Sequence, residues 1–396
     1  MCSRILLTDG DCRIALPILR SLSKKGINAV VAADRKRMLL SFSKYCKTIF
    51  ARPYPNAQVD RSLFLDTIEK MLKRTQFDVL FPVCEWAVVP ISEERHRITR
   101  YTRLPLPSHQ SLMSTFDKTQ TLKLAKELNV PAPETYEVHS ESELQEIARK
   151  VTYPAVVKPR TSWVWTGEQA SFSRASYVRS PVELVETYQK IHKVFPFPLV
   201  QQYIPGIGRM YSIGALYSHS HSRAMCCIKV DRAYPISGGN SVLRESAPMD
   251  PKMKEYATKL LDALNWHGIA EVEFKIDPRD NTPKLMEING RWWASLEVVT
   301  RAGMDLPYML YRLAMDGDVP TAPGYKVGVK VRWIEGDLHH VYNVFRHRFG
   351  FEFPPRLRTL INFLKFYDLN LSYENFEWGD PLPFWVSAFR IKDKNI

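Results

Sequence analysis

Hydrophobic and polar residues alternate in a strand-and-helix pattern over the first 110 residues. Short apolar runs bounded by turn residues predict strands, and longer runs with a helical period predict helices. The runs follow the order strand, helix, strand, helix, strand, at 4–9, 12–25, 27–34, 62–75 and 77–83. This order predicts a parallel sheet with helices on its faces. The segment has no G-x-G-x-x-G motif, so it does not indicate a dinucleotide site.

The turn-rich stretch TRLPLPSHQS predicts a boundary near residue 110. Beyond it, the pattern predicts further strands and helices. The expected strands are 153–160, 196–206, 210–218 and 222–232, with helices near 117–129 and 250–266.

The stretch EVEFKIDPRDNTPKLMEINGR, residues 271–291, predicts a β-hairpin that carries acidic and amide side chains. In its second strand the period of two places Leu285, Glu287 and Asn289 on one face, with Glu287 and Asn289 about 7 Å apart. Glu273 on the first strand faces them if the register allows. Two carboxylates and an amide oxygen form a patch of hard ligands that suits Mg²⁺, whereas a solvated strand face is the simpler alternative.

The chain carries a formal net charge of +13, so nucleic acid has to be considered as a partner. The excess is largest in residues 1–110, which hold 19 Lys and Arg against 10 Asp and Glu. The sequence has no zinc finger, RNP-like aromatic motif or basic tail. We therefore expect a basic surface that attracts anionic substrates, and we do not expect nucleic acid to bind.

The six cysteines include no C-x-x-C pair, which favours reduced, packed thiols. The apolar runs are too short to span a bilayer, and the N-terminus has no signal-peptide pattern. These features predict a cytoplasmic protein without a membrane partner.

Residues 326–396 differ from the rest of the chain, since they are dense in aromatic residues and weakly periodic. The simpler interpretation is an extension that packs on the main body. The alternative is a segment that recognises the substrate.

Five motifs, taken in order, resemble those of the ATP-grasp superfamily, in particular its carboxylate–amine ligase branch. They are DKTQTLKLAKELNVPAPET, YPAVVKP, VQQYIPG, VEF and MEINGR. The resemblance covers roughly residues 1–315 and implies a fold like that of biotin carboxylase and the carbamoyl-phosphate synthetase large subunit. It implies an α/β and α+β protein with a Rossmann-like pre-ATP-grasp domain (1–110), a small lobe with a lid (111–205), a large lobe with the Mg/ATP site (206–325) and the C-terminal extension (326–396).

The resemblance also implies roles for individual residues. Those expected at ATP are Lys118, Lys158, Gln201, Gln202 and Ile204. The expected ligands of Mg²⁺, for which Mn²⁺ can substitute, are Glu273, Glu287 and Asn289. Arg291 is expected to hold the transferring phosphate or the substrate.

Three more cations are candidates for the substrate side of the site. Lys229 and Arg232 lie where such ligases often place a cation facing the phosphate, although a basic surface pair is an equal alternative. Arg244 follows a glycine-containing loop and is a candidate for binding a substrate carboxylate. The lid segment 160–174 departs from the family, because it contains a single glycine and two tryptophans.

The resemblance predicts an ATP- and Mg²⁺-dependent ligase that joins a small-molecule carboxylate to an amine through an acyl phosphate, releasing ADP and phosphate. It also suggests a homodimer. Two alternatives remain open at this point. One is a carboxylase-type ATP-grasp enzyme that uses bicarbonate, and the other is a degenerate nucleotide-binding module with a regulatory role.

Overall fold

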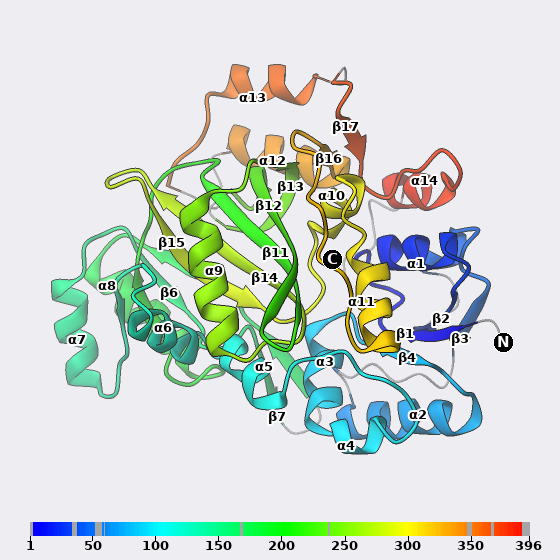
Figure 1. Cartoon of the computed structure of the whole chain (residues 1–396). Helices are drawn as coiled ribbons and strands as arrows, with labels where there is room; N and C mark the ends of the chain where they lie inside the picture. Colours follow the sequence, from blue (N-terminus) through cyan, green and yellow to red (C-terminus); the bar gives the residue numbers. More distant parts are fainter. Residues whose placement is uncertain are drawn as a thin grey trace.

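Four β-sheets organise the part of the chain that the computed structural model describes, which comprises residues 3–33, 38–51, 58, 60–166, 169–236, 238–346, 351–365 and 368–389. The sheets have four, four, seven and two strands, and helices cover the faces of the larger ones (Figure 1). The mixed α/β and α+β class expected from the sequence is confirmed.

The N-terminal sheet has the strand order β3-β2-β1-β4, and all of its strands run parallel. The apolar runs of the sequence form these strands because both faces of the sheet are covered. Ile5, Leu6 and Leu7, which are consecutive along β1, are all fully buried. The parallel α/β arrangement is as expected, whereas the narrower Rossmann-like assignment stays a prediction. The elements are β1 (Arg4–Leu7), α1 (Ala15–Lys24), β2 (Asn28–Ala33), the 3₁₀ turn η1 (Leu39–Phe42), β3 (Thr48–Ala51), α2 (Arg61–Arg74), β4 (Val79–Phe81), α3 (Glu85–Glu93) and α4 (Arg95–Ile98).

The second sheet is antiparallel and has the order β5-β10-β6-β9, with α7 and α8 packed against each other beside it. A two-stranded hairpin, β7-β8, extends from it. The elements are α5 (His109–Phe116), α6 (Lys118–Glu127), β5 (Thr135–Tyr136), α7 (Glu141–Lys150), β6 (Ala155–Lys158), β7 (Trp163–Thr166), β8 (Gln169–Phe172), β9 (Ser176–Val178), α8 (Pro181–His192) and β10 (Leu199–Gln202).

The largest sheet has the order β15-β14-β11-β12-β13-β16-β17 and lies at the centre of Figure 1. One face packs against α9, and α10 and α11 contact the other face. Its elements outside the C-terminal segment are β11 (Met210–Ser218), β12 (His221–Tyr234), β13 (Asn240–Ser246), α9 (Pro251–Ala263), β14 (Gly268–Asp277), β15 (Thr282–Asn289), α10 (Leu296–Arg301) and α11 (Leu306–Asp316).

The C-terminal segment packs on both of the larger units. Its strands β16 and β17 extend the largest sheet, and α12 packs on β12 and β13. Near the end of the segment, Arg20 Nε of α1 donates to Asp380 Oδ2 at 2.9 Å, which ties the segment to the N-terminal sheet. The packing role is therefore present, and the division into four segments stays a prediction. The elements are β16 (Lys330–Arg332), α12 (Ile334–Arg346), α13 (Arg356–Phe363), β17 (Leu371–Tyr373) and α14 (Leu382–Phe389).

Among the helices of the described residues, none is both long enough and apolar enough to cross a membrane.

Candidate active site

The β14–β15 hairpin places its acidic and amide side chains in one cluster. In the observed register Glu273 lies opposite Glu287, and Glu271 lies opposite Asn289. The register shifts after Glu273, so that Phe274 pairs with Leu285. The period of two along a strand predicts that Leu285 and Glu287 share one face, and this prediction is wrong. The bulge turns Leu285 into the core next to Phe274.

Asn289 holds the carboxylates of the hairpin in place. Its Nδ2 donates to Glu273 Oε1 at 2.9 Å and to Glu271 Oε2 at 3.2 Å. The other oxygen of Glu271 accepts from Ser212 Oγ at 2.9 Å, on the adjacent strand β11. Gly290 then lets the chain leave the strand, because a Cβ atom there would lie 2.7 Å from Leu112 Cδ1 of α5.

The electrostatics of this cluster depend on burial and on the neighbouring charges. Burial, together with the carboxylates of Glu287 and Glu271, raises the pKa of Glu273 well above its usual range. Burial also raises the pKa of Glu271 to about 7. For Glu287 the cations outweigh the effect of burial, so its pKa lies below the ordinary value. These cations are Lys158, Lys118 and Arg291.

A divalent cation fits this cluster. The carboxylates of Glu273 and Glu287 raise the cost of each other's ionisation, and a cation between them removes that cost. Among the described residues, no group of three His, Cys, Asp or Glu is arranged to hold a metal by itself. Magnesium needs only one or two carboxylates when phosphate and water oxygens complete its shell. Turning the Asn289 amide would present its oxygen as a further ligand.

Two lysines face the hairpin from the neighbouring elements. Lys158, at the end of β6, donates from Nζ to the carbonyl of Met286 at 3.2 Å, and burial lowers its pKa. Lys118, the first residue of α6, donates from Nζ to Ser162 Oγ at 3.2 Å. Both ammonium groups therefore lie near carboxylates, and within the described part of the chain neither forms an ion pair, an arrangement that suits the binding of phosphate.

Strand β10 and the residues after it supply the wall expected at the base of a nucleotide. Gln201 is buried and donates from Nε2 to Thr135 Oγ1 at 2.9 Å, so its side chain supports the strand. Gln202 is half-buried, and Ile204 is buried. All three line the same cavity as the hairpin and the two lysines.

The cavity that joins these groups has a volume of about 1210 Å³, large enough for a nucleotide and a second small molecule. All eight residues that the sequence predicted at ATP and at the metal line it: Lys118, Lys158, Gln201, Gln202, Ile204, Glu273, Glu287 and Asn289. Arg291 lines it as well.

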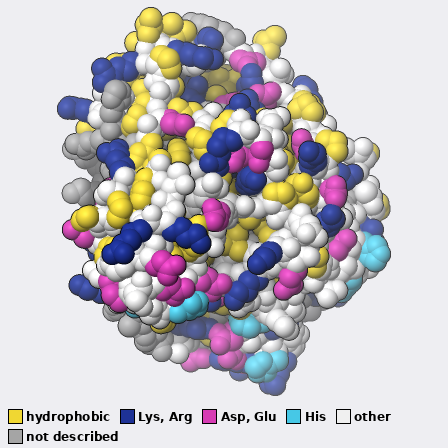
Figure 2. All heavy atoms as spheres, turned by 90° about the vertical axis from the view of Figure 1, so that its left-hand side faces the viewer, with side chains coloured by type: hydrophobic (Ala, Val, Ile, Leu, Met, Phe, Trp, Pro, Cys, Tyr) yellow, Lys and Arg dark blue, Asp and Glu magenta, His cyan; other side chains and the backbone are white. Residues whose placement is uncertain are grey.

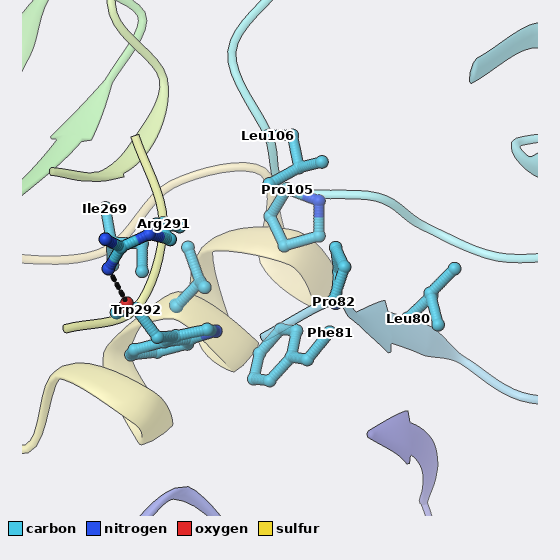
Figure 3. Close-up of a pocket in the computed structure, with 9 residues that line it drawn as sticks. Leu80, Phe81, Pro82, Pro105, Leu106, Ile269, Arg291 and Trp292 are labelled. Atoms are coloured by element: carbon cyan, nitrogen blue, oxygen red, sulfur yellow. Dashed lines mark hydrogen bonds between the residues drawn. The ribbon is translucent and has the colours of Figure 1, made fainter. Parts of the chain in front are cut away.

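Arg291 lies between the hairpin and the N-terminal sheet. Its Nη1 donates to the carbonyl of Trp292 at 2.9 Å, drawn as a dashed line in Figure 3. Its Nε lies 3.7 Å from Glu85 Oε2, at the start of α3. The small pocket of Figure 3 around Phe81 and Pro105 has room for about one water molecule and is no substrate site. Arg291 thus couples the hairpin to the N-terminal unit.

Two predicted cations, Lys229 and Arg244, are not among the residues that line the cavity. Lys229 pairs in register with Tyr211, and its Nζ forms an ion pair with Asp231 Oδ1 at 2.7 Å. Arg244 is fully buried, forms an ion pair with Glu374 and donates to Ser241 Oγ at 3.0 Å. As corrections, we assign neither residue to substrate, because neither side chain lines the cavity.

The buried pair of Arg244 and Glu374 predicts a structural defect. Glu374→Gln should lower the free energy of unfolding by about 3–5 kcal/mol, because it leaves a buried guanidinium without its carboxylate. Urea unfolding measures this loss. The matched variant Glu377→Gln, whose carboxylate is partly exposed beside Lys24, should cost about 1 kcal/mol or less. Equal losses in the two variants would contradict the interpretation.

Two acidic residues that line the cavity were not assigned to the site from the sequence: Glu85, and Asp9, whose place at a strand end was interpreted as a plain turn. Glu85 is buried beside Arg291, and burial raises its pKa. Asp9 is also buried, and it accepts hydrogen bonds from Cys84 N at 3.0 Å and Trp86 Nε1 at 3.0 Å. Both follow buried strands of the parallel sheet, whose carboxyl ends meet at one edge. Their place after a buried strand is the sequence feature that points to the site.

Arg13 and Arg232 add positive charge at the end of the cavity that the C-terminal segment closes. The Arg13 guanidinium lies 3.8 Å from the centre of the Trp333 ring, and its Nη1 is 3.4 Å from Glu374 Oε1 without a hydrogen-bond partner among the described residues. Arg232 binds Asp337 through two donors, at 2.6 and 2.7 Å. The sequence indicated Arg232 but gave no sign of Arg13, since its neighbours come from residues more than 300 positions away.

The lid hairpin β7–β8 lies against the N-terminal unit. Trp163 of β7 meets Trp86 of α3 edge to face, with 5.3 Å between ring centroids, and also packs on Phe172. Gly167, its single glycine, lies outside the described residues. In the described part of the lid, indole packing therefore joins it to the opposite wall of the cavity.

The fold and the site together define an ATP-grasp domain, and comparisons with known proteins agree. Residues 195–337 match the family described as "ATP-grasp in the biosynthetic pathway with Ter operon". The chain contains an ATP-grasp domain.

The D-aspartate ligase of Enterococcus faecium (strain Aus0004) is 23% identical over 284 residues, which make up 67% of this chain and 66% of that ligase. The chain spans only 20% of a carbamoyl phosphate synthase large chain from Thermoanaerobacter that it also matches.

Two solved structures show the same fold. The L-amino acid ligase from Bacillus licheniformis has a TM-score of 0.61 at 17% identity, covering 79% of this chain and 74% of that one. The biotin carboxylase domain dimer of the Hydrogenobacter thermophilus 2-oxoglutarate carboxylase, in complex with MgADP, ADP and bicarbonate, has a TM-score of 0.66 at 16% identity, covering 83% and 73%.

Proposed function

We propose that the protein is an ATP-dependent carboxylate–amine ligase that forms an amide bond through an acyl phosphate. The observation that carries the proposal is the single cavity in which Lys118 and Lys158 face the Glu273, Glu287 and Asn289 cluster, with Arg291 beside them. The similarity to a D-aspartate ligase and to the fold of an L-amino acid ligase supports this class of reaction.

In this proposal the chain binds ATP between two walls. Strand β10 and Ile204 hold the base, while Lys118 and Lys158 neutralise the phosphates. Mg²⁺, or Mn²⁺ in its place, would be held by Glu273, Glu287 and Asn289, and when bound it neutralises the charge on the phosphoryl oxygens.

The substrate side of the cavity positions the acid. Arg291 holds the carboxylate so that one of its oxygens attacks the γ-phosphorus and the bond to ADP breaks. Arg13 and Arg232 attract the acid to the closed end. The amine then attacks the acyl carbon, the carbon–oxygen bond breaks, and phosphate leaves with one oxygen of the acid. The amine loses a proton, and no protein nucleophile takes part. Positioning and charge neutralisation supply the rate.

Release of ADP from Mg-ATP in the presence of pooled carboxylic and amino acids, with hydroxylamine as the amine, tests the proposal. ADP together with a hydroxamate is the expected result. ADP formation that depends on bicarbonate alone would favour a carboxylase-type reaction instead. Tight ATP binding without ADP from any pool would favour the regulatory module.

The proposal also includes a cytoplasmic location and a dimeric state. Cys12, Cys46, Cys84, Cys226 and Cys227 are free thiols, which agrees with a reducing cytoplasm. A homodimer is proposed on the basis of the dimeric carboxylase domain that shares the fold.

Arg13→Gln should raise the KM of the acid roughly 10- to 100-fold, because a charge-assisted hydrogen bond to the substrate is lost. The KM of ATP should stay within twofold, since Arg13 lies at the far end from β10. Steady-state kinetics with each substrate varied in turn measures the two KM values separately. Arg100→Gln, an exposed change in the same unit, is the matched control. A rise in both KM values would point to a general structural role for Arg13.

A further inference from the structure

The apolar residues of α13 face solvent although their spacing is that of a buried stripe. Leu357, Leu360, Ile361 and Leu364 follow the i, i+3, i+4, i+7 pattern that normally faces a core. They are 70, 39, 49 and 54% exposed. The described residues leave this stripe without a partner.

The orientation of α13 is fixed by its opposite side. Thr359 is buried there, although it is polar. Arg332 donates from Nη2 to the carbonyl of Phe363 at 2.7 Å, and its guanidinium lies 4.6 Å from the centre of the Phe363 ring. The body of the protein thus holds the polar side of α13 and presents the leucine side outward.

The neighbouring helix α12 repeats the feature. Leu338, Tyr342 and Phe345 follow the i, i+4, i+7 pattern and are 47, 48 and 42% exposed. The two helices are in contact, and Arg356 donates from Nη2 to the carbonyl of Phe345 at 3.2 Å. Figure 2 is turned about the vertical axis from Figure 1, so the end of the molecule that carries α13 is at the top of both views. Hydrophobic and basic side chains lie next to each other at the top of Figure 2.

Basic residues flank the exposed stripe of α13 on both edges. At 100° per residue, Arg358 and Lys365 lie beside one edge and Arg356 beside the other. Arg346 ends α12. No described carboxylate pairs with any of these four cations. The nearby acids already bind other groups: Asp368 pairs with Lys330, Glu352 accepts from Gly206 N, and Glu335 accepts from Ser387.

The apolar stripe and the cations beside it together favour one kind of partner over the others. A second copy meeting the same face would bring two sets of unpaired cations together, which is unfavourable. Nucleic acid would meet leucines at the centre of the contact instead of a basic groove. An anionic bilayer supplies both an apolar interior for the stripe and negative headgroups for its edges.

We propose that α13, with α12 beside it, seats the protein on the surface of an anionic phospholipid bilayer. The apolar stripe enters the headgroup boundary, and Arg346, Arg356, Arg358 and Lys365 bind lipid phosphates. This revises the expectation of no membrane partner, because that expectation considered spanning segments and the exposure of α13 is not evident from the sequence. The proposal is independent of the ligase reaction.

Co-sedimentation of the full chain with phospholipid vesicles tests the proposal. Vesicles of phosphatidylcholine with phosphatidylglycerol should bind the protein, and binding should weaken at high salt. Leu357→Ser/Ile361→Ser should lower the binding constant at least about tenfold. Arg358→Glu/Lys365→Glu should lower it about 25-fold or more, at roughly fivefold for each cation lost.

Matched controls use an exposed helix on another part of the surface. Val182→Ser and Lys190→Glu, both on α8, should leave vesicle binding unchanged. All variants should melt at the wild-type temperature, because the changed side chains are exposed. A lack of vesicle binding by the wild type would overturn the proposal, as would equal binding to phosphatidylcholine alone. A dimer that Leu357→Ser/Ile361→Ser separates in ultracentrifugation, without vesicle binding, would assign the surface to a second copy.

Discussion

Glu287→Gln is expected to lower Mg²⁺-dependent turnover by roughly 10³-fold while the protein stays folded. The substitution keeps the size of the side chain and removes its negative charge. Glu287 is the carboxylate of the cluster that three cations keep ionised, with a pKa below its ordinary value. In the proposed site, its loss removes a charge that would hold a divalent cation at the phosphates. Turnover is measured as ADP release with Mg²⁺ varied, and circular dichroism reports the fold.

Asp280→Asn is the matched control on the same hairpin. Asp280 is exposed in the turn between β14 and β15 and pairs with Lys284. Its change should leave turnover within about twofold, since a surface pair contributes little. Wild-type turnover in Glu287→Gln would remove the carboxylate from the proposed metal site. Recovery of activity in Glu287→Gln at high Mg²⁺ would show that the loss is one of metal affinity.

Lys158→Met is expected to weaken ATP binding roughly 10- to 100-fold, because one of the two ammonium groups proposed to bind the phosphates is lost from a buried site. The burial that lowers the pKa of Lys158 also strengthens its attraction to phosphate. The change should also raise the pKa of Glu287, which loses its largest favourable charge. Calorimetry with a non-hydrolysable ATP analogue measures the affinity.

Lys284→Met provides the comparison for this prediction. Lys284 lies on the same hairpin, and its charge pairs with Asp280 outside the cavity. Its loss should leave ATP affinity unchanged. If Lys158→Met binds the analogue as tightly as the wild type, the lysine has no part in the nucleotide site.

Residues that share a strand or a hairpin were predictable from the sequence. Glu273, Glu287 and Asn289 come together because a period of two and a short turn determine their faces. Lys158 and Gln201 lie on paired strands, β6 and β10, that local patterns also indicated. The faces of the hairpin follow from local geometry, whereas the resemblance to the ATP-grasp superfamily implied that Lys158 and Gln201 share one site.

Contacts between distant segments were not predictable in this way. Arg244 has the charge and the loop of a substrate-binding residue, and only the fold shows that Glu374 lies against it. Arg13 meets Trp333 and Glu374 for the same reason. Leu285 was misplaced because the bulge after Glu273 shifts the register by one residue. Strand pairing and side-chain packing across the whole chain decide these positions.

The most direct test of the account follows one oxygen atom. The acid that gives a hydroxamate, labelled with ¹⁸O in its carboxylate, is incubated with Mg-ATP, amine and enzyme, and the released phosphate is analysed by mass spectrometry. If the carboxylate attacks the γ-phosphorus, each phosphate released carries one oxygen from the acid, and Glu287→Gln loses labelled phosphate and ADP together. Phosphate that carries no label while the amide forms would contradict an acyl phosphate and with it the proposed ligase reaction.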